Sequence, residues 1–275
     1  MIGFDHIGSP GQLGNQMFKY ASLKGIAKNN NLEYCIPPNK HNFFNINPFT
    51  SNKKLTEHRL LYIFKMTNLK NIKVTNFEKT IKEKNFTFDY ELYENCPDNV
   101  QINGFFQSEK YFKKFKKEIL EDFSFKKKYN DKVKKFAQDF GDFTSIHVRR
   151  NDFITNPNHS ELSIDYYKNA LKNFSASEKF IVFSDDIGWI NSQKLFKGQN
   201  IFSSNDLGIS GDIKELCLMT KATNSIIANS TFSWWGAWLS NSKNIITPKF
   251  WFKDSQLSSL DTKDLLPEEW IKVAN

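Results

Sequence analysis

Strand-like and helix-like apolar patterns alternate over the first 37 residues of the chain. Residues 1–8 (MIGFDHIG) and residues 32–37 are short and rich in apolar side chains, as expected of buried strands. Residues 15–30 between them have the apolar spacing of a helix, which the three asparagines at 29–31 end. We therefore expect the chain to open as a βαβ unit, with Gly11–Asn15 at the first crossing from strand to helix.

The same alternation returns near Asp142 and continues with greater regularity. The expected strands cover residues 143–150, 179–186, 224–230 and 243–248, and the expected helices cover residues 163–174 and 212–222, with a further helix beginning at 231. Strands separated by helices of this length indicate a parallel sheet with right-handed crossovers. The fold class is therefore α/β, with two domains, residues 1–140 and 141–275, facing each other across a cleft.

The middle of the chain combines an apolar stripe with many lysines. Residues 100–123 predict a strand, a turn at Gly104 and then a helix. Lysines interleave this stripe from Lys110 to Lys135, and the whole chain has a formal net charge of +8. Such a charge could attract nucleic acid, an anionic membrane or an anionic small substrate. Because neither an RNA-binding aromatic signature nor a helix-turn-helix pattern is present, we interpret the lysines as a solvated helix face and expect no nucleic-acid partner.

Composition narrows the class of protein further. The chain has 275 residues, of which 39% are hydrophobic, as in a globular protein with a sizeable core. Its cysteines, Cys35, Cys96 and Cys217, are widely spaced and odd in number, so we expect reduced thiols in a cytoplasm. The N-terminus does not resemble a signal peptide, and no stretch approaches the roughly 20 apolar residues of a membrane span. At most a peripheral membrane association is expected.

The first candidate site motif is IHVRRND, residues 146–152, at the end of a predicted strand. His147 and Arg149 would share one face of that strand, and Arg150 would emerge at its carboxyl end. Ligands bind at such strand ends in open α/β sheets, and arginine forks match the oxygens of phosphate groups. The alternative is a surface ion pair between Arg150 and Asp152.

The second motif is FSDD, residues 183–186, where another predicted strand ends. The Asp185 carboxylate could accept hydroxyl groups of a ribose, or it could cap the helix that follows. Asp185 and Asp186 could also be two ligands of a metal ion. We expect no metal site, because no third carboxylate or histidine stands nearby at ligand spacing.

The third motif, NSTFSWWGAWL, covers residues 229–239 at a strand-to-helix junction. Ser230 and Thr231 would stand at the helix N-terminus, where hydroxyls and backbone N–H groups bind anions. Simple N-capping by either residue is the alternative. The three tryptophans of this block are interpreted as core packing.

A single carboxylate, Asp212, opens the helix before that strand. It could cap the helix, or it could accept the two parallel N–H donors on the edge of guanine. Taken together, the motifs suggest a nucleoside diphosphate held by the second domain. The glycine-containing loop of the first domain would then bring backbone close to the ligand, and Asn15 could donate a hydrogen bond to it.

These residues resemble the bacterial α-1,2-fucosyltransferases of glycosyltransferase family 11. Four blocks, GQLGNQMFKYA, GFFQSEKYF, HVRRND and NSTFSWW, are similar to family blocks and occur in the family's order over residues 11–239. The resemblance implies a GT-B-like fold of two Rossmann-like domains, of which the first serves the acceptor and the second binds GDP-fucose. It also implies donor contacts from Gly14, Asn15, His147, Arg149, Arg150, Asp212, Ser230 and Thr231, to which the sequence pattern adds Asp185.

The activity that this resemblance implies is transfer of L-fucose from GDP-β-L-fucose to the 2-hydroxyl of a galactose residue in a glycan, with inversion. Arg149 and Arg150 would offset the charge of the leaving diphosphate without a metal or other cofactor. Asp152 is the candidate base, with His159 and Glu161 as alternatives, unless Asp152 only orients one of the arginines. The rival functions are a nucleotide- or glycan-binding module without turnover, and a fucosyltransferase of different linkage.

Overall fold

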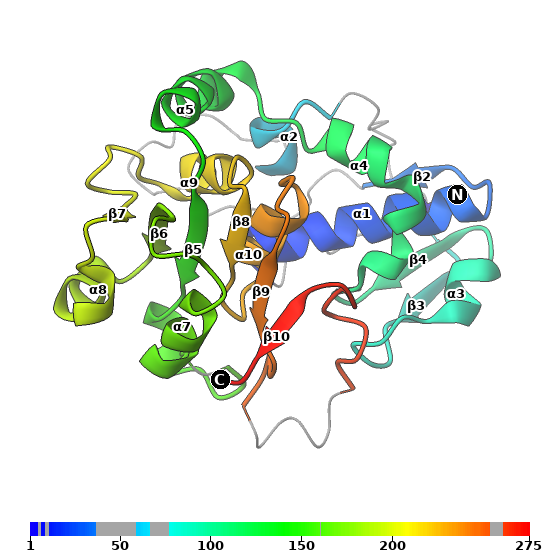
Figure 1. The fold of residues 1–275 in the computed structure, drawn as a ribbon. Helices are drawn as coiled ribbons and strands as arrows, with labels where there is room; N and C mark the ends of the chain where they lie inside the picture. Colours follow the sequence, from blue (N-terminus) through cyan, green and yellow to red (C-terminus); the bar gives the residue numbers. More distant parts are fainter. Residues whose placement is uncertain (5–6, 9–10, 37–58, 67–76, 160, 254–260) are drawn as a thin grey trace. The chain divides into compact units, whose positions relative to one another are not determined.

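The computed structural model of the chain divides into two compact units (Figure 1). The structure describes residues 1–4, 7–8, 11–36, 59–66, 77–159, 161–253 and 261–275. The first unit comprises Met1–Lys126 together with Asp261–Pro267, and the second comprises Lys127–Leu260 together with Glu268–Asn275.

A four-stranded parallel sheet forms the framework of the first unit, with the order β2-β1-β4-β3. Its strands are β1 (Ile2–Gly3), β2 (Tyr34–Cys35), β3 (Lys79–Lys82) and β4 (Val100–Asn103). The helices are α1 (Leu13–Asn29), α2 (Arg59–Ile63), α3 (Tyr90–Glu94), η2 (Glu109–Tyr111), η3 (Lys113–Phe115) and α4 (Lys116–Asp122). The opening βαβ unit is thus confirmed, although the first strand covers only two of the eight residues predicted. Residues 5–6 of that prediction lie outside the described residues.

Helix α1 is buried on nearly every side, which explains its central role in the first unit. Its side chains Tyr20 and Lys24 both donate to the carboxylate of Asp122, at 2.7 and 2.5 Å. Gly25 packs directly against the backbone of η2, since a Cβ atom there would lie 1.9 Å from the carbonyl oxygen of Tyr111. The helix is therefore fixed by a backbone contact that only glycine permits.

The second unit contains a six-stranded parallel sheet with the order β10-β9-β8-β5-β6-β7. Its strands are β5 (Thr144–Val148), β6 (Phe180–Ser184), β7 (Ile201–Ser203), β8 (Asn224–Ile226), β9 (Ile245–Pro248) and β10 (Ile271–Val273). The helices are α5 (Lys127–Phe140), α6 (Asn151–Ile154), α7 (Ile164–Leu171), α8 (Ile187–Ser192), η4 (Lys194–Phe196), α9 (Asp212–Met219) and α10 (Thr231–Trp238). The strands and helices predicted from residue 142 onward are confirmed, with shorter bounds.

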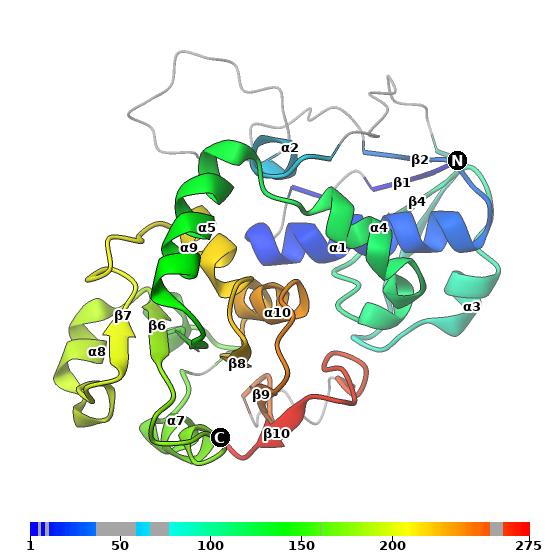
Figure 2. The ribbon, with the colours of Figure 1, turned by 45° about the horizontal axis from the view of Figure 1, so that its top comes forward.

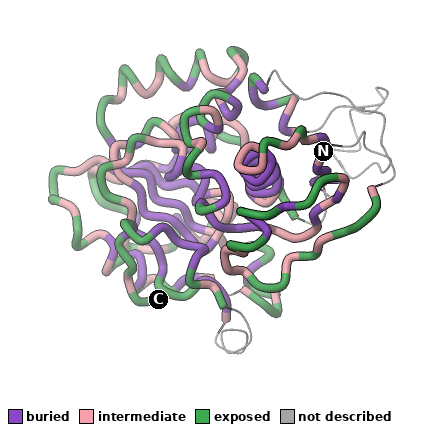
Figure 3. The backbone as a smooth tube through the Cα atoms, turned by 90° about the vertical axis from the view of Figure 1, so that its right-hand side faces the viewer, coloured by how far each residue is buried: buried purple, intermediate pink, exposed green. Residues whose placement is uncertain are grey.

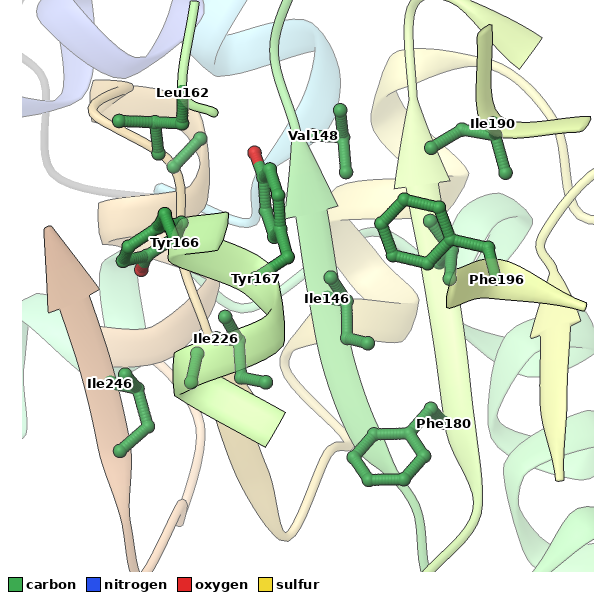
Figure 4. Close-up of a cluster of buried hydrophobic side chains, with 13 residues drawn as sticks. Ile146, Val148, Leu162, Tyr166, Tyr167, Phe180, Ile190, Phe196, Ile226 and Ile246 are labelled. Carbon is green, nitrogen blue, oxygen red and sulfur yellow. The ribbon is translucent and has the colours of Figure 1, made fainter. Parts of the chain in front are cut away.

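Both faces of this sheet are covered, as a parallel sheet requires. Figure 2 shows α7 on one side of the strands and α5 and α9 on the other. Every residue of β5 and the first four residues of β6 are buried, and buried strands appear as purple segments side by side in Figure 3. On the α7 side, the rings of Tyr166 and Tyr167 pack on Ile146 and its neighbours (Figure 4). The two tyrosine hydroxyls donate to the carbonyls of Ile227 (2.6 Å) and His147 (3.3 Å), so α7 is also held by hydrogen bonds.

The tryptophans of the NSTFSWW block lie in the core, as expected. Trp234 and Trp235 have no exposed surface, and Trp238 is 4% exposed. The ring of Trp234 lies 5.3 Å from that of Trp270, close to the C-terminus. These large rings bury much apolar surface where α10 packs within the second unit. They do not carry the chemistry of the motif.

The boundary between the units differs from the prediction. The second unit begins at Lys127 rather than at residue 141, because α5 packs against α9. Residues 261–267 return to the first unit, where the Asp264 carboxylate accepts hydrogen bonds from Lys110 Nζ (2.6 Å) and the Phe88 amide (2.9 Å). The predicted division into residues 1–140 and 141–275 did not include this return to the first unit, because it depends on contacts between residues far apart in the sequence.

Three further expectations concern the lysines, the cysteines and membrane-spanning segments. The lysines of α5 do lie on a solvated face, since Val133 alone among the residues of this helix is buried. Cys35, Cys96 and Cys217 are free and buried. Among the residues that the structure describes, no helix has the length and apolar character needed to traverse a lipid bilayer.

Candidate functional site

The strand order of the second unit fixes where a ligand site is expected. Counted from β5 as the first strand, the order is 3-2-1-4-5-6, as in dinucleotide-binding sheets. The direction of winding reverses between β5 and β8, and ligands of such sheets bind at the carboxyl ends of the strands at that point. Arg149 and Arg150 directly follow β5, and Ser230 and Thr231 follow β8. The topology thus brings two of the sequence motifs to the switch point.

Arg149 is held between two carboxylates. Its Nη2 lies 2.7 Å from Asp152 Oδ1, and its Nη1 lies 3.0 Å from Asp185 Oδ2. Asp152 is therefore paired with Arg149, not with Arg150 as the surface ion-pair alternative assumed. Each terminal nitrogen of Arg149 therefore already faces one carboxylate.

Arg150 is held differently, through only one edge of its guanidinium group. Its Nε lies 3.2 Å from Asp186 Oδ2, and the guanidinium carbon lies 4.3 Å from the centre of the Trp189 ring. Within the described part of the chain, Nη1 and Nη2 of Arg150 make no hydrogen bond or ion pair. Stacking on Trp189 limits the freedom of the side chain, while the two terminal nitrogens stay available to an anion.

Asp185 and Asp186 have separate tasks at the end of β6. Asp186 caps α8, because its Oδ1 accepts from the Trp189 amide at 2.9 Å. Asp185 accepts from the Arg150 amide at 2.9 Å, and its carbonyl accepts from Asn151 Nδ2 at 2.6 Å. Asp185 thus fixes the loop after β5, while a ribose contact stays a prediction. Among the described residues, no three histidine, cysteine or acidic side chains gather as ligands of a metal ion.

His147 lies inside the second unit rather than at its surface. It is 6% exposed, its Nδ1 is buried without a hydrogen bond, and its ring packs 5.6 Å from that of Phe232. Burial lowers the pKa of His147 to about 3, with a further contribution from the charge of Arg149. The imidazole is therefore neutral, and it connects β5 to the first turn of α10.

The N-terminus of α10 contains both hydroxyls predicted there. Ser230 is the N-cap, and its Oγ accepts from the Phe232 amide at 3.4 Å, so the capping alternative holds for this residue. Thr231 is the first helical residue and is half-buried. The first-turn amides of this eight-residue helix and the Thr231 hydroxyl remain the candidate anion contacts.

Asp212 is the first residue of α9 and is exposed to solvent. Its Oδ1 accepts from the amide of Ile213 at 2.8 Å. One turn further along, Glu215 is half-buried and accepts from Ser204 Oγ at 3.2 Å. Burial raises the pKa of Glu215 to about 7. Sequence reasoning missed this second carboxylate, because neither its burial nor its contact with Ser204 is contained in the local pattern.

Glu215 should make stability depend on pH in a window that a single substitution can identify. Between its ordinary pKa of 4.5 and the raised value of about 7, the folded protein keeps a proton that the unfolded chain releases. Stability is thus expected to fall by on the order of 2 kcal/mol as the pH rises through this window. As the pH rises through this window, the melting temperature of the wild type should fall by a few degrees more than that of Glu215→Gln. If the melting temperatures of both proteins changed by the same amount between pH 4.5 and 7.5, this expectation would be contradicted.

The candidate residues of the first unit lie at the start of α1. Asn15 Oδ1 accepts from Gln107 Nε2 at 2.9 Å. Gly11 has a φ of +107°, and a Cβ atom on it would lie 2.4 Å from Asn15 Nδ2. Gln16 Nε2 reaches the carbonyl oxygens of Gly8 and Gly11 at 3.4 and 3.5 Å. The glycine loop is therefore packed tightly against Asn15, and Gly14 follows in the first turn of the helix.

Comparison of the sequence with known protein families shows to which family the chain belongs. The model of the family described as glycosyl transferase family 11 matches residues 3–274. The chain belongs to glycosyl transferase family 11.

Relatives of this family 11 protein span almost the whole chain. It is similar to an alpha-1,2-colitosyltransferase of Escherichia coli, with 30% identity over 96% of both chains. It is also 25% identical to galactoside alpha-(1,2)-fucosyltransferase 2 of Sus scrofa, over 97% of this chain and 79% of the relative. Among solved structures, NodZ alpha-1,6-fucosyltransferase soaked with GDP-fucose matches with a TM-score of 0.54. That match has 13% identity over 90% of this chain and 95% of NodZ, so it supports the GT-B-like fold alone.

The candidate bases of this family 11 glycosyltransferase lie in contrasting surroundings. Asp152 is 55% exposed and paired with Arg149. His159 stacks on the ring of Phe153, with ring centres 4.6 Å apart, and lies 4.8 Å from the tilted ring of Phe252; burial lowers its pKa. Glu161 is half-buried. Asp152 is the most accessible of the three, and it is also attached to an arginine of the site.

Proposed function

We propose that this family 11 enzyme transfers L-fucose from GDP-β-L-fucose to the 2-hydroxyl of a galactose residue in a glycan, with inversion. The observation that carries the proposal is Arg150, which stands at the switch point of the sheet with both terminal nitrogens unused. A diphosphate needs such a fork, and the α10 N-terminus follows the neighbouring strand. The names of the two relatives support the α-1,2 linkage.

The roles of the site residues follow from their contacts. Arg150 binds the diphosphate, and its charge stabilises the leaving group as the bond to fucose breaks. Arg149 joins it when the diphosphate replaces the Asp152 carboxylate. The released Asp152 then accepts the proton of the attacking hydroxyl. Ser230, Thr231 and the first-turn amides of α10 add donors to the phosphates. Asp185 contributes to donor binding by fixing the loop after β5, and His147 by connecting β5 to the first turn of α10. Gly14 and Asn15 contribute from the first unit.

The direct test is a transfer assay with GDP-fucose and a panel of galactose-terminated glycans. A mass increment of one fucose, with GDP released in equal amount, is the expected product. A second arm contains EDTA, because the proposed mechanism assigns the work of a metal to the arginines. Binding of GDP-fucose without transfer to any glycan would favour a binding module. Activity that EDTA removes and Mn²⁺ restores would favour a metal at Asp185 and Asp186.

The donor sugar has one specific competitor, because the Escherichia coli relative is named a colitosyltransferase. Colitose differs from L-fucose by the absence of the 3-hydroxyl. Comparing kcat/KM for the two GDP-sugars distinguishes the candidates. A site that hydrogen-bonds the 3-hydroxyl should discriminate strongly against the deoxy sugar, because the partner group would be left unpaired.

Asp212 is the proposed reader of guanine, and its exposed position on the first turn of α9 is compatible with that role. Asp212→Ala is expected to weaken GDP binding by roughly 10- to 100-fold, because two hydrogen bonds to a charged group are lost. Binding of ADP, which lacks both donors, should barely change. Calorimetric titration of both nucleotides measures the effect, and Asp206→Ala, another exposed aspartate, is the matched control. Full preference for GDP in the variant would leave Asp212 as a residue of the helix end only.

The proposal includes a cytoplasmic location with at most peripheral membrane contact, as expected from the sequence. The exposed lysines of α5 are compatible with anionic headgroups. Co-sedimentation with anionic and neutral vesicles tests this contact, and equal recovery with both would contradict it.

A further inference from the structure

The block GFFQSEKYF lies in the first unit, and none of its residues has a role in the mechanism above. Within it, Gln107 is 6% exposed, and its Nε2 donates to Asn15 Oδ1 at 2.9 Å across 92 residues of sequence. We propose that Gln107 is a positioning residue that fixes the amide of Asn15 so that its Nδ2 donates to the bound donor substrate. This inference rests on the proposed function, because it requires that Asn15 contacts GDP-fucose.

The chemistry of the two amides gives the contact its direction. An asparagine side chain has one acceptor oxygen and one donor nitrogen, which a half-turn about its last torsion exchanges. Gln107 donates to the oxygen, so the oxygen of Asn15 is occupied and the nitrogen is turned toward the Gly11 side. Every polar atom of a GDP-sugar diphosphate is an acceptor. Only this orientation of the Asn15 amide can therefore bind phosphate oxygens.

The backbone before Gln107 is held unusually firmly. The Glu83 carboxylate accepts from the amides of Phe105 (2.6 Å) and Phe106 (2.8 Å). Gly104 makes this possible, because a Cβ atom there would lie 2.3 Å from Glu83 Cβ. Phe106 then takes a left-handed conformation with a φ of +50°, which is costly for a residue with a side chain.

A further contact connects this turn to α1. Ser22 Oγ, on the same helix as Asn15, donates to the carbonyl oxygen of Phe106 at 3.0 Å. The turn and the helix are thus joined at two points, Ser22 and Asn15. The strained conformation at Phe106 delivers the Gln107 side chain to Asn15. These contacts of the Gly-Phe-Phe-Gln sequence together hold Gln107 in place against Asn15.

A double-mutant cycle tests whether Gln107 acts through Asn15. The affinity for GDP-fucose is measured by calorimetry for the wild type, Gln107→Leu, Asn15→Ala and the double variant, together with kcat, KM and the melting temperature. Gln107→Leu should weaken GDP-fucose binding by about 3- to 10-fold in the wild-type background. It should have no further effect once Asn15 is alanine.

Gln107→Glu gives the sharper readout, because a carboxylate can only accept from the Asn15 amide. The amide should then turn its nitrogen toward residue 107 and present its oxygen to the phosphates. We expect a loss of affinity larger than that of Gln107→Leu, which the Asn15→Ala background again abolishes. Gln101→Glu is the matched control, since Gln101 makes a comparable 2.8 Å hydrogen bond to Thr80 and should leave GDP-fucose binding unchanged.

The outcomes separate this inference from the proposed function. If the wild type neither binds nor transfers fucose, the proposed function is wrong and this inference falls with it. If the wild type is active, the inference is overturned when Gln107→Leu binds GDP-fucose as the wild type does, or when its effect is equal in both backgrounds. A drop in melting temperature without a change in affinity would likewise reduce Gln107 to a purely structural residue.

Discussion

Replacing Arg150 with lysine is expected to lower fucosyl transfer by roughly 100-fold or more, as for loss of a transition-state donor. Lysine keeps the charge but loses the planar fork that matches two phosphate oxygens. It also loses the stacking on Trp189, at 4.3 Å, that holds the guanidinium in place. The effect should fall mainly on kcat, because the charge on the diphosphate grows as the bond to fucose breaks. Steady-state kinetics with GDP-fucose and the best glycan of the panel measure it.

The sequence offers a matched control for this substitution. Besides Arg149 and Arg150, the sequence has one other arginine, Arg59, which lies in α2 of the first unit and has no assigned role in donor binding. Arg59→Lys should leave kcat within about 3-fold of the wild type, as for a substitution outside the site. Near wild-type transfer by Arg150→Lys would show that the diphosphate is bound by other groups, with Arg149 the first alternative.

Gly25→Ala is expected to destabilise the protein by roughly 3 kcal/mol or more, at the upper end of overpacking effects. The added methyl group would lie 1.9 Å from the backbone oxygen of Tyr111, and a backbone atom cannot move aside as a flexible side chain can. Helix α1 must therefore shift away from η2. This cost greatly exceeds the gain of up to about 1 kcal/mol that alanine normally gives over glycine within a helix. Denaturant unfolding followed by tryptophan fluorescence measures the difference in free energy of unfolding.

A second glycine separates this clash from the general effect of the substitution. Gly188 lies in α8, where the nearest atom to an added Cβ is Asp186 Oδ1 at 3.7 Å, an ordinary contact. Gly188→Ala should be neutral or slightly stabilising, by up to about 1 kcal/mol. If Gly25→Ala were equally harmless, the close approach of α1 to η2 would be wrong.

Local patterns in the sequence were sufficient for much of the second unit. The alternation of apolar strands with amphipathic helices predicted β5, β6, β8 and β9, because most residues of each strand are buried and a buried strand reads as an apolar run. The same reasoning placed Arg149, Arg150 and Ser230 at strand ends. These positions follow from chain direction alone, without knowledge of any long-range contact.

Other features depend on contacts that no local pattern contains. Asp152 pairs with Arg149, and Asp186 pairs with Arg150, whose guanidinium also stacks on Trp189. His147 alternates with its neighbours as a strand residue should, but its depth of burial depends on α10. The contact of Gln107 with Asn15 was equally hidden, because the two residues lie 92 positions apart.

The return of residues 261–267 to the first unit has a consequence for protein engineering. Exchanging the first half of this enzyme with that of a relative, in order to change its acceptor, would separate Asp264 from Lys110 and from the Phe88 amide. A successful chimera should therefore carry two pieces from the same parent, residues 1–126 and residues 261–267. Variants truncated from the C-terminus through residues 261–267 should fail to fold for the same reason, because they lose contacts that stabilise the first unit.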